Sequence, residues 1–374
     1  MTVTGPLAGT ALWPIRSRLS DNRVDPARRA EIMADPGFGR FFTDHMVRVP
    51  WTAEGGWQEG ELIPYGPIAL DPATSFIHYG QAIFEGLKAY RHEDGSLRTF
   101  RPLENAQRMR ASARRLAMPE PPVEMFVGSL VALVEADRDW VPPGPDRSLY
   151  LRPFMYSTEV GLGVRPANSY DFCLIASPAG AYFPRGVKPV TVWLSDDYVR
   201  AAPGGTGEAK CAGNYAASLI AQAEAAQHGC DQVVWLDAVE RRWIEEMGGM
   251  NLCFVYGKGD AARLMTPALT GTLLPGVTRN TLLQLARDLG IRADEGRISV
   301  EEWREGNESG EISEVFACGT AAVITPVGAV KSRMGSWTVG DGESGPISMR
   351  LRTALLEIQN GQAPDKHGWL TQLA

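Results

Sequence analysis

The stretch Gly204-Gly-Thr-Gly-Glu-Ala-Lys-Cys-Ala-Gly-Asn-Tyr215 places Lys210 among glycines, alanines and a cysteine. It is the only lysine between Lys188 and Lys258. A surface lysine usually stands among other charged residues, whereas these small neighbours allow backbones to pack closely. A desolvated lysine can lose its proton and become a nucleophilic amine, which arginine cannot do. Lys210 is therefore a candidate nucleophile, with a solvated lysine in a flexible loop as the alternative.

A second unusual stretch, Ile244-Glu-Glu-Met-Gly-Gly-Met-Asn-Leu252, offers a carboxylate. Glu245 and Glu246 precede Met247-Gly-Gly-Met-Asn-Leu252, which we expect to form a turn that leads into a strand over residues 252–256. A carboxylate beside a pyridine nitrogen keeps that nitrogen protonated, so that the ring can accept electrons. Together with Lys210, this predicts a lysine Schiff base with pyridoxal phosphate. Taken alone, an acid in a turn is more often only solvated.

Length and composition are typical of an ordinary globular protein with two domains. The chain has 374 residues, of which 44% are hydrophobic and 22% charged, and its net charge is −7. This acidic balance argues against nucleic-acid and anionic-membrane partners. The five cysteines form no CxxC pair, so we expect neither a disulfide framework nor a metal site. We also expect no signal peptide and no membrane helix, and hence a cytoplasmic protein.

Local patterns predict the elements around these stretches. Helices are expected over residues 102–117, started by Pro102, and over 125–138. A helix over 215–227 would have Asn214 as its N-cap and end at Gly229. Strands are expected over residues 148–157 and 190–194, and residues 178–189 form the best candidate linker.

Three features could hold a phosphate. A helix within residues 274–290 is expected to have Thr278 at its cap, and helix N-termini attract anions. Thr320 follows Gly319 in a tight turn, and Arg108 on the first helix can supply a full positive charge. Each feature has an ordinary alternative: simple capping, a simple turn and a surface arginine.

The substrate side is indicated by one strand and one aromatic segment. Tyr150 and Arg152 share a face of the strand over residues 148–157, and an inward arginine is costly unless it meets an anion. A salt bridge at the rim of the strand is an equally good interpretation. Phe76, Tyr79 and Phe84 are expected to line an apolar pocket or to form core.

Several stretches together resemble the branched-chain amino acid aminotransferases, which are fold-type IV pyridoxal phosphate enzymes. The resemblance runs from about residue 40 to the C-terminus, and the ordered set is far more specific than any one member. The matching stretches are His78-Tyr-Gly-Gln-Ala-Ile-Phe-Glu-Gly86, Tyr150-Leu-Arg-Pro153, Gly180-Ala-Tyr182, Ala209-Lys-Cys-Ala-Gly-Asn-Tyr215, Glu246-Met-Gly-Gly-Met-Asn-Leu252, Leu274-Pro-Gly-Val-Thr-Arg279 and Gly319-Thr-Ala-Ala-Val-Ile-Thr-Pro326.

The resemblance implies a role for each matching position. Lys210 would form the Schiff base and move the proton from the substrate Cα, and Glu246, not Glu245, would pair with the pyridine nitrogen. The remaining cofactor contacts would come from Tyr215 at the phenolic oxygen, Leu274 under the ring, and Arg108, Val277, Thr278 and Thr320 at the phosphate. The substrate pocket would be shaped by Phe84, Tyr150, Arg152, Tyr182, Ala321 and Ala322, with Tyr79 entering from a neighbouring subunit.

The resemblance also implies a fold, a substrate class and an assembly. The fold would be mixed α/β, with a smaller N-terminal domain over residues 1–179, an interdomain loop over 180–189 and a larger pseudo-barrel domain over 190–374. The enzyme would exchange amino groups between leucine, isoleucine or valine and 2-oxoglutarate, giving branched-chain 2-oxo acids and glutamate. It would be at least a homodimer. Mammalian members carry a CxxC pair after the Gly-Thr-Ala turn, which this chain lacks, so we expect no thiol switch there.

Other activities remain open within the same fold. A D-amino acid aminotransferase and an aminodeoxychorismate lyase share it, and the lyase releases pyruvate without an amino acceptor. A catalytically silent interaction protein is the alternative from another class. A scaffold has no need to retain Lys210, Glu246, Tyr215 and Arg108 together.

Overall fold

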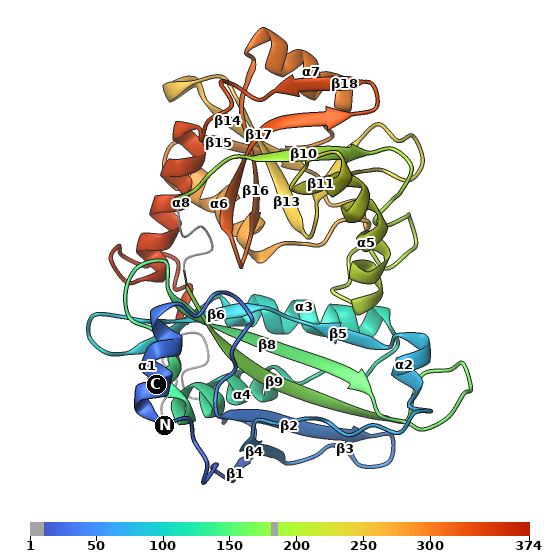
Figure 1. Ribbon diagram of the computed structural model, residues 1–374, viewed down its shortest axis with the longest axis vertical. Helices are drawn as coiled ribbons and strands as arrows, with labels where there is room; N and C mark the ends of the chain where they lie inside the picture. Colours follow the sequence, from blue (N-terminus) through green and yellow to red (C-terminus); the bar gives the residue numbers. More distant parts are fainter. Residues whose placement is uncertain (1–10, 181–185) are drawn as a thin grey trace. The chain divides into compact units, whose positions relative to one another are not determined.

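The computed structural model describes residues 11–180 and 186–374, and the chain divides into two compact units (Figure 1). The first unit comprises Met1–Pro184, Ala209–Ala212 and Leu356–Ala374, and the second Arg185–Glu208 and Gly213–Leu355. The domain boundaries expected at residues 179 and 190 stay a prediction. The structure adds that two later segments, one of them carrying Lys210, belong to the first unit. Within the described ranges, no helix has the length and apolar character that crossing a membrane requires.

A ten-stranded sheet forms the first unit, in the order β1-β4-β2-β9-β8-β6-β7-β19, with β3 on β2 and β5 on β8. The neighbouring strands are antiparallel except for the pair β1 and β4. The bounds are β1 Ile15–Ser17, β2 His45–Thr52, β3 Gly56–Trp57, β4 Gly60–Pro64, β5 Ala82–Phe84, β6 Leu87–Arg91, β7 Leu97–Phe100, β8 Ser148–Ser157, β9 Ser169–Ala179 and β19 Leu370–Gln372.

Helices cover this sheet with faces that the sequence pattern marks. In α4, Phe126, Leu130 and Leu133 recur at helical spacing and are fully buried, so the helix packs on β2 and β9 (Figure 1). In α3, Pro102 occupies the first turn, where its missing N–H costs nothing. The helices of this part are α1 Pro26–Ala34, α2 Ser75–Tyr79, α3 Pro102–Arg115, α4 Val123–Ala136 and the 3-10 turn Arg138–Trp140. Helices α3 and α4 and the strand Ser148–Ser157 confirm the expected elements.

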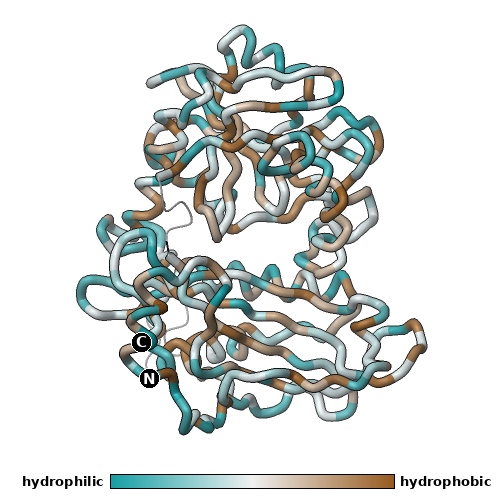
Figure 2. The backbone as a smooth tube through the Cα atoms, viewed as in Figure 1, coloured by the Kyte–Doolittle hydropathy of each residue, from teal (hydrophilic) through white to brown (hydrophobic). Residues whose placement is uncertain are grey.

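A nine-stranded sheet forms the second unit, and six of its strands close into a ring. The ring runs β12-β11-β10-β17-β16-β13, and β13 pairs again with β12, which confirms the expected pseudo-barrel. Hydrophobic stretches are concentrated on strands, whereas the connecting loops are mostly hydrophilic (Figure 2). The strands are β10 Val190–Ser195, β11 Gln232–Leu236, β12 Ile244–Met247, β13 Met250–Tyr256, β14 Arg263–Pro267, β15 Arg292–Gly296, β16 Ile312–Gly319, β17 Val323–Ser332 and β18 Gly335–Thr338.

Two helix starts differ from the expectation. The remaining helices are α5 Ala212–Gln227, α6 Val277–Asp288, α7 Val300–Ser309, α8 Pro346–Gln359 and the 3-10 turn Gly259–Ala261. Asn214 lies inside α5 rather than at its N-cap, because its side chain is hydrogen-bonded to Thr206 through both the amide nitrogen and oxygen. Thr278 lies in the first turn of α6, whose N-cap is Gly276 without a side-chain cap. Both expected caps were therefore wrong.

Candidate active site

Lys210 is held by two elements that are distant in sequence. Its carbonyl oxygen accepts a hydrogen bond from the backbone N–H of Phe84 in β5 (3.0 Å), and its own N–H donates to the Ser112 hydroxyl on α3 (2.9 Å). Cys211 forms a β-bridge with Ile83. The Lys210 backbone thus extends the sheet edge at β5. The alternative of a solvated lysine in a flexible loop does not hold.

Two cations flank the ring of Phe84. The Lys210 Nζ lies 4.8 Å from the ring centroid, and the Arg152 guanidinium carbon also lies 4.8 Å from it. Such cation–π contacts are stronger in a desolvated place than on the surface. Arg152 also donates to the hydroxyl of Tyr150 (3.1 Å), two residues away on the same face of β8. The structure therefore brings together Phe84, Tyr150, Arg152 and Lys210, four residues to which the family resemblance assigns roles in the active site.

Arg108 reaches this cluster through a buried ion pair with Glu85. Its Nε and Nη2 donate to the two carboxylate oxygens at 2.7 and 2.8 Å, and both side chains are buried. Asn105 on the same helix donates to Glu85 as well (2.8 Å). Burial alone would raise the pKa of Glu85, but Arg108, with a smaller contribution from Lys210, holds it below its ordinary value. Glu85 is thus a buried anion that fixes the guanidinium of Arg108.

The surroundings change the protonation of Lys210. Burial, followed by the nearby Arg108 and Arg152 guanidinium groups, lowers the pKa of its amine to about 8, while Glu85 and Tyr150 act in the opposite direction. An amine with a pKa near 8 is partly neutral at neutral pH. It can therefore act as a nucleophile or accept a proton, which an ordinary surface lysine cannot do.

In the second unit, Glu246 is a buried carboxylate on β12 rather than a solvated acid in a turn. Its Oε1 accepts hydrogen bonds from the backbone N–H of Leu274 and from Arg200 (3.2 Å). Arg200 in turn donates to the carbonyl oxygens of Gly207 and Thr272. The carboxylate is therefore fixed in position by a backbone segment and one guanidinium. The expected turn is present at Gly248 and Gly249, between β12 and β13, while Glu245 and Glu246 lie in the strand before it and are buried, so the alternative of solvated acids does not hold.

The other residues assigned to the second unit lie near this carboxylate in the sheet. Glu246 is paired with Asn251 on β13, which is paired with Cys318 on β16. The Asn251 side chain donates to the Leu274 carbonyl (3.0 Å) and packs against Gly276, the N-cap of α6. The first turn of α6 contains Val277 and Thr278, and the turn after Gly319 contains Thr320, Ala321 and Ala322. This arrangement gathers a carboxylate, a helix N-terminus and a hydroxyl-bearing turn.

Two further expected residues, Tyr215 and Tyr79, lie on the helices α5 and α2, and the position of a third is not described. Tyr215 lies in the first turns of α5, with its ring beside Gly249 in the turn between β12 and β13. Tyr79 ends α2, is partly exposed, and donates to the carbonyl of Leu162 in the β8–β9 loop (2.6 Å). Its described contacts are with this loop and not with the Lys210 cluster. Tyr182 lies outside the described residues.

Sequence reasoning missed Glu85, Arg200 and Thr272. Glu85 stands inside the motif Phe84-Glu-Gly86, so its position was visible, but no pattern linked it to Arg108 on another element. Arg200 and Thr272 lie in loops with no periodic signal. The one signal that points to such a residue is chemical: if Glu246 is buried, its carboxylate requires a hydrogen-bond donor such as Arg200.

The chain is similar to known aminotransferases over most of its length. Residues 82–330 match the profile of the family described as amino-transferase class IV. The chain belongs to this family. A relative from Streptomyces coelicolor, named probable branched-chain-amino-acid aminotransferase, is 60% identical over 96% of this chain and 99% of its own length. A branched-chain-amino-acid aminotransferase from Mycolicibacterium smegmatis is also 60% identical, over 94% of this chain and 96% of the relative.

Solved structures agree with the class IV fold. The branched-chain amino acid aminotransferase from Escherichia coli has a TM-score of 0.71 at 30% identity, covering 87% of this chain and 99% of that one. The T.th. enzyme of the same name, solved with pyridoxamine 5'-phosphate, has a TM-score of 0.70 at 28% identity, covering 87% and 98%. The family resemblance and the fold class expected from the motifs are thereby confirmed.

The Glu85–Arg108 ion pair of this aminotransferase leads to a testable prediction for the pKa of Lys210. The change Glu85→Gln removes a negative charge that raises the pKa of Lys210 and leaves the lowering effect of Arg108 in place. We expect the pKa of the Lys210 amine to fall below its value of about 8. The pH dependence of reductive methylation of Lys210 in cofactor-free protein, followed by peptide mass spectrometry, measures it.

The matched control is Asn105→Ala. This variant also loses a hydrogen bond to Glu85 but no charge, so its shift should be smaller than that of Glu85→Gln. A pKa that is unchanged or raised in Glu85→Gln contradicts the electrostatic account.

Proposed function

We propose that this protein transfers the amino group between branched-chain L-amino acids (leucine, isoleucine, valine) and 2-oxoglutarate, using pyridoxal phosphate bound to Lys210. The observation that carries the proposal is the Lys210 amine, with its pKa of about 8, beside Phe84, Tyr150 and Arg152. The names of relatives that are 60% identical over nearly the whole chain support the same reaction. We also infer that the protein works in the cytoplasm.

The donor set of the chain fits the proposed cofactor. We assign the phosphate to Arg108, Thr320 and the α6 N-terminus at Val277 and Thr278, where no side chain caps the helix. Glu246 supplies a fixed carboxylate for the pyridine nitrogen, Tyr215 a hydroxyl for the phenolic oxygen, and Leu274 a contact with the ring. When bound, the cofactor supplies an electron-accepting ring that stabilises negative charge at the substrate Cα.

Lys210, Arg108 and Glu85 have different roles in the proposed reaction. Once the substrate amine has replaced it on the cofactor, Lys210 Nζ would take the proton from the substrate Cα and pass it on to the cofactor, and it would carry a proton to Cα in the reverse half-reaction; a pKa near the working pH suits both transfers. Arg108 adds positive charge near the amine and keeps it partly neutral, while Glu85 prevents the guanidinium of Arg108 from moving. Glu85 is therefore a positioning residue.

The substrate pocket must accept an apolar side chain and the γ-carboxylate of glutamate. The T.th. enzyme has been solved with 4-methylvaleric acid and with N-(5'-phosphopyridoxyl)-L-glutamate, which present these two kinds of group. In this chain, the Phe84 ring offers an apolar wall and Arg152 offers a guanidinium above it. The Nε of Arg152 is buried and has no hydrogen-bond partner in the described structure. We propose that Arg152 binds the γ-carboxylate, with Tyr182, Ala321 and Ala322 completing the pocket.

We further propose a homodimer built on one apolar surface of the first unit. Exposed Ile77 and Tyr79 on α2 adjoin the β8–β9 loop, in which Val160, Leu162 and Val164 are exposed by 58%, 64% and 82%. The two segments are joined by the Tyr79–Leu162 hydrogen bond and by a β-bridge between Thr74 and Val160. Soluble monomers rarely expose apolar groups so densely, which supports a protein partner here.

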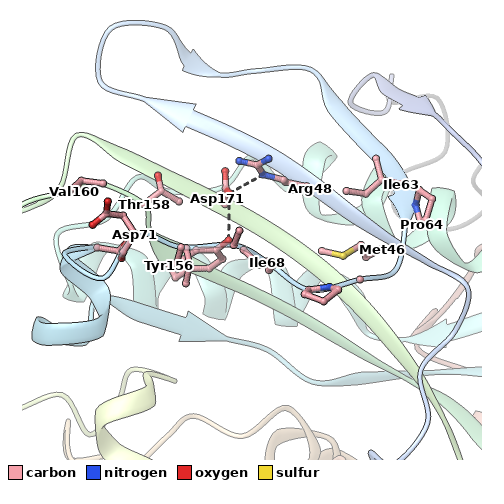
Figure 3. A pocket seen from close by; sticks show the side chains of 15 residues that line it. Met46, Arg48, Ile63, Pro64, Ile68, Asp71, Tyr156, Thr158, Val160 and Asp171 are labelled. Carbon is pink, nitrogen blue, oxygen red and sulfur yellow. Dashed lines mark hydrogen bonds and ion pairs between the residues drawn. The ribbon is translucent and has the colours of Figure 1, made fainter.

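A neighbouring cavity of about 400 Å³ extends this surface (Figure 3). Exposed Ile68 and Val160 line it, and Asp171 on its wall accepts from Arg48 (2.8 Å) and Tyr156 (3.4 Å). The charges of Arg48 and Asp171 are thus paired, and Ile68, Leu70 and Val160 contribute exposed apolar side chains to the lining. We assign this face to the second subunit, and we propose that Tyr79 contributes to the pocket of that subunit.

One assay tests the proposed reaction. Purified protein with pyridoxal phosphate, leucine and 2-oxoglutarate should form glutamate and 4-methyl-2-oxopentanoate. Absence of glutamate would refute the branched-chain activity. Parallel reactions with D-alanine and with aminodeoxychorismate, the latter followed by pyruvate release, separate the two rival activities of the fold. Absence of a visible absorption band from bound cofactor would instead indicate a silent relative.

The nucleophile is tested by Lys210→Ala. We expect this variant to fold but to lose covalent attachment of the cofactor, and its kcat to fall on the order of 10³-fold, because the group that moves the proton is gone. Borohydride reduction followed by peptide mass spectrometry measures attachment. The control Lys258→Ala removes a lysine from a surface turn and should keep both properties. Full turnover by Lys210→Ala would show that another group is the nucleophile.

The double role of the pocket is tested by Arg152→Ala. Loss of the guanidinium removes a charged hydrogen bond to glutamate but none to leucine, so kcat/KM should fall about tenfold more for glutamate than for leucine. Tyr150→Phe, which removes only the hydroxyl that accepts from Arg152, should give a smaller difference. Equal losses for both substrates in Arg152→Ala would exclude the proposed role.

Assembly is tested by Leu162→Asp. A carboxylate at a side chain that is 64% exposed does not disturb the subunit fold but places an unpaired charge in the proposed interface. Light scattering during gel filtration should show a lower molar mass than for the wild-type protein. Met334→Asp, at a residue 79% exposed in the second unit, is the matched control and should leave the mass unchanged. If both variants keep the wild-type mass, the interface lies elsewhere.

A further inference from the structure

A second cavity, of about 310 Å³, lies wholly within the second unit. Glu245 lines it, whereas the adjacent Glu246 does not. A register shift between β11 and β12 falls at these two positions; Glu245 turns toward Thr272 in the cavity wall, whereas the Glu246 carboxylate turns toward the backbone N–H of Leu274. Its volume is at the lower end of the range for small-molecule sites. The other walls come from residues 237–244, 267–273 and 296–297, together with Pro203.

Glu245 carries an unsatisfied polar atom at this cavity. Its side chain is buried, with 4% of the residue exposed. Its Oε1 accepts a hydrogen bond from the Thr272 hydroxyl, but its Oε2 has no partner in the described structure. Burial raises the pKa of this carboxyl, against the opposing effects of Thr272 and Arg200. A buried carboxyl oxygen without a donor is costly, and a ligand with a donor group would satisfy it.

The opposite charge is available in the same cavity. Arg297 lines it and stacks on the ring of Trp243, with 5.2 Å between the guanidinium carbon and the ring centroid. Arg297 makes no ion pair with any residue that the structure describes. The Trp243 ring and Leu273 add apolar wall.

The two remaining acids of the lining do not compete for this role. Asp237 accepts hydrogen bonds from four backbone N–H groups in residues 239–243, and so organises the turn between β11 and β12. Glu240 is exposed. The polar groups that remain include the Glu245 Oε2, the Arg297 guanidinium and the buried Trp243 Nε1, a donor without a hydrogen-bond partner in the described structure.

We propose that this cavity is a second binding site, for a small aliphatic α-amino acid. Its ammonium donates to Glu245 Oε2, its carboxylate pairs with Arg297, and its side chain contacts Trp243 and Leu273. A simple amine would leave Arg297 without a partner, and a simple carboxylate would be repelled by the Glu245 side of the cavity. The zwitterion satisfies both.

The site is joined to Glu246 by one short segment. Thr272 donates its hydroxyl to Glu245 and accepts at its carbonyl from Arg200, which is paired with Glu246. Leu273 lines the cavity, and the next backbone N–H, that of Leu274, donates to Glu246. A ligand that moves Thr272 or Leu273 therefore changes the hydrogen bonds of the carboxylate assigned to the cofactor. Two sites coupled in this way affect each other's affinity reciprocally.

Equilibrium dialysis of the holoenzyme tests the proposal. The probe is 1-aminocyclopentane-1-carboxylic acid, an aliphatic zwitterion without a Cα hydrogen, so that no turnover consumes it. We expect the wild-type protein to bind one more probe molecule per chain than Glu245→Gln does at the same probe concentration. In the variant, the dissociation constant of this additional molecule should be at least tenfold higher. Glu240→Gln, a change at the exposed acid of the same lining, should bind as the wild type does. Equal binding by wild type and Glu245→Gln overturns the proposal.

A second variant and two further probes complete the test. Arg297→Gln changes an exposed residue that the fold does not need, and it should also lose the additional probe molecule. Cyclopentylamine and cyclopentanecarboxylate each lack one charged group and should bind at least tenfold more weakly. If the amine alone binds as tightly as the amino acid, or if Arg297→Gln binds normally, an amino acid site is excluded. These outcomes do not depend on turnover, so they are separate from the test of transamination.

Discussion

The buried ion pair of Glu85 and Arg108 is the constraint around which the first unit is arranged. A charge that loses water must find a partner of opposite sign with good geometry, and here the two-oxygen contact and Asn105 meet this demand. Glu85 directly follows β5, and Arg108 lies on α3. These are the same two elements that hold the backbone of Lys210. The elements joined by this pair therefore also position the amine, whose pKa is lowered first by burial and then by Arg108, while Glu85 acts in the opposite direction.

The second unit also contains a buried ion pair, but there the carboxylate and the guanidinium have the opposite roles. There the carboxylate of Glu246 is the group that acts, and the guanidinium of Arg200 is the group that holds it. Arg200 is itself fixed by the carbonyl oxygens of Gly207 and Thr272. In both units a functional charge is held by a second buried charge and by backbone groups. Such groups do not need to reorganise when a ligand arrives, which is the physical basis of preorganised binding.

The sequence predicted periodic elements well and single polar contacts poorly. The strand Ser148–Ser157 and the helix beginning at Pro102 follow from local alternation and from proline chemistry. Asn214 and Thr278 are both good capping residues, but neither is an N-cap. The Asn214 side chain is hydrogen-bonded to Thr206 instead, and α6 begins after Gly276, which has no side chain to cap it. Local patterns alone left an ordinary alternative open for every site residue. The ordered family motifs, and not spacing, selected Lys210 and Glu246.

Glu245 and Glu246 show why local pattern cannot assign such roles. They are identical side chains on consecutive positions of one buried strand. A register shift between β11 and β12 interrupts the regular alternation at these positions, and the two carboxylates meet different donors. Glu246 receives a backbone N–H and a guanidinium, whereas Glu245 receives one hydroxyl and keeps one oxygen without a donor. The first environment stabilises an anion in one fixed place. The second raises the pKa of its carboxyl and leaves one hydrogen-bonding position for a ligand, so the two neighbours have different chemistry because their partners differ.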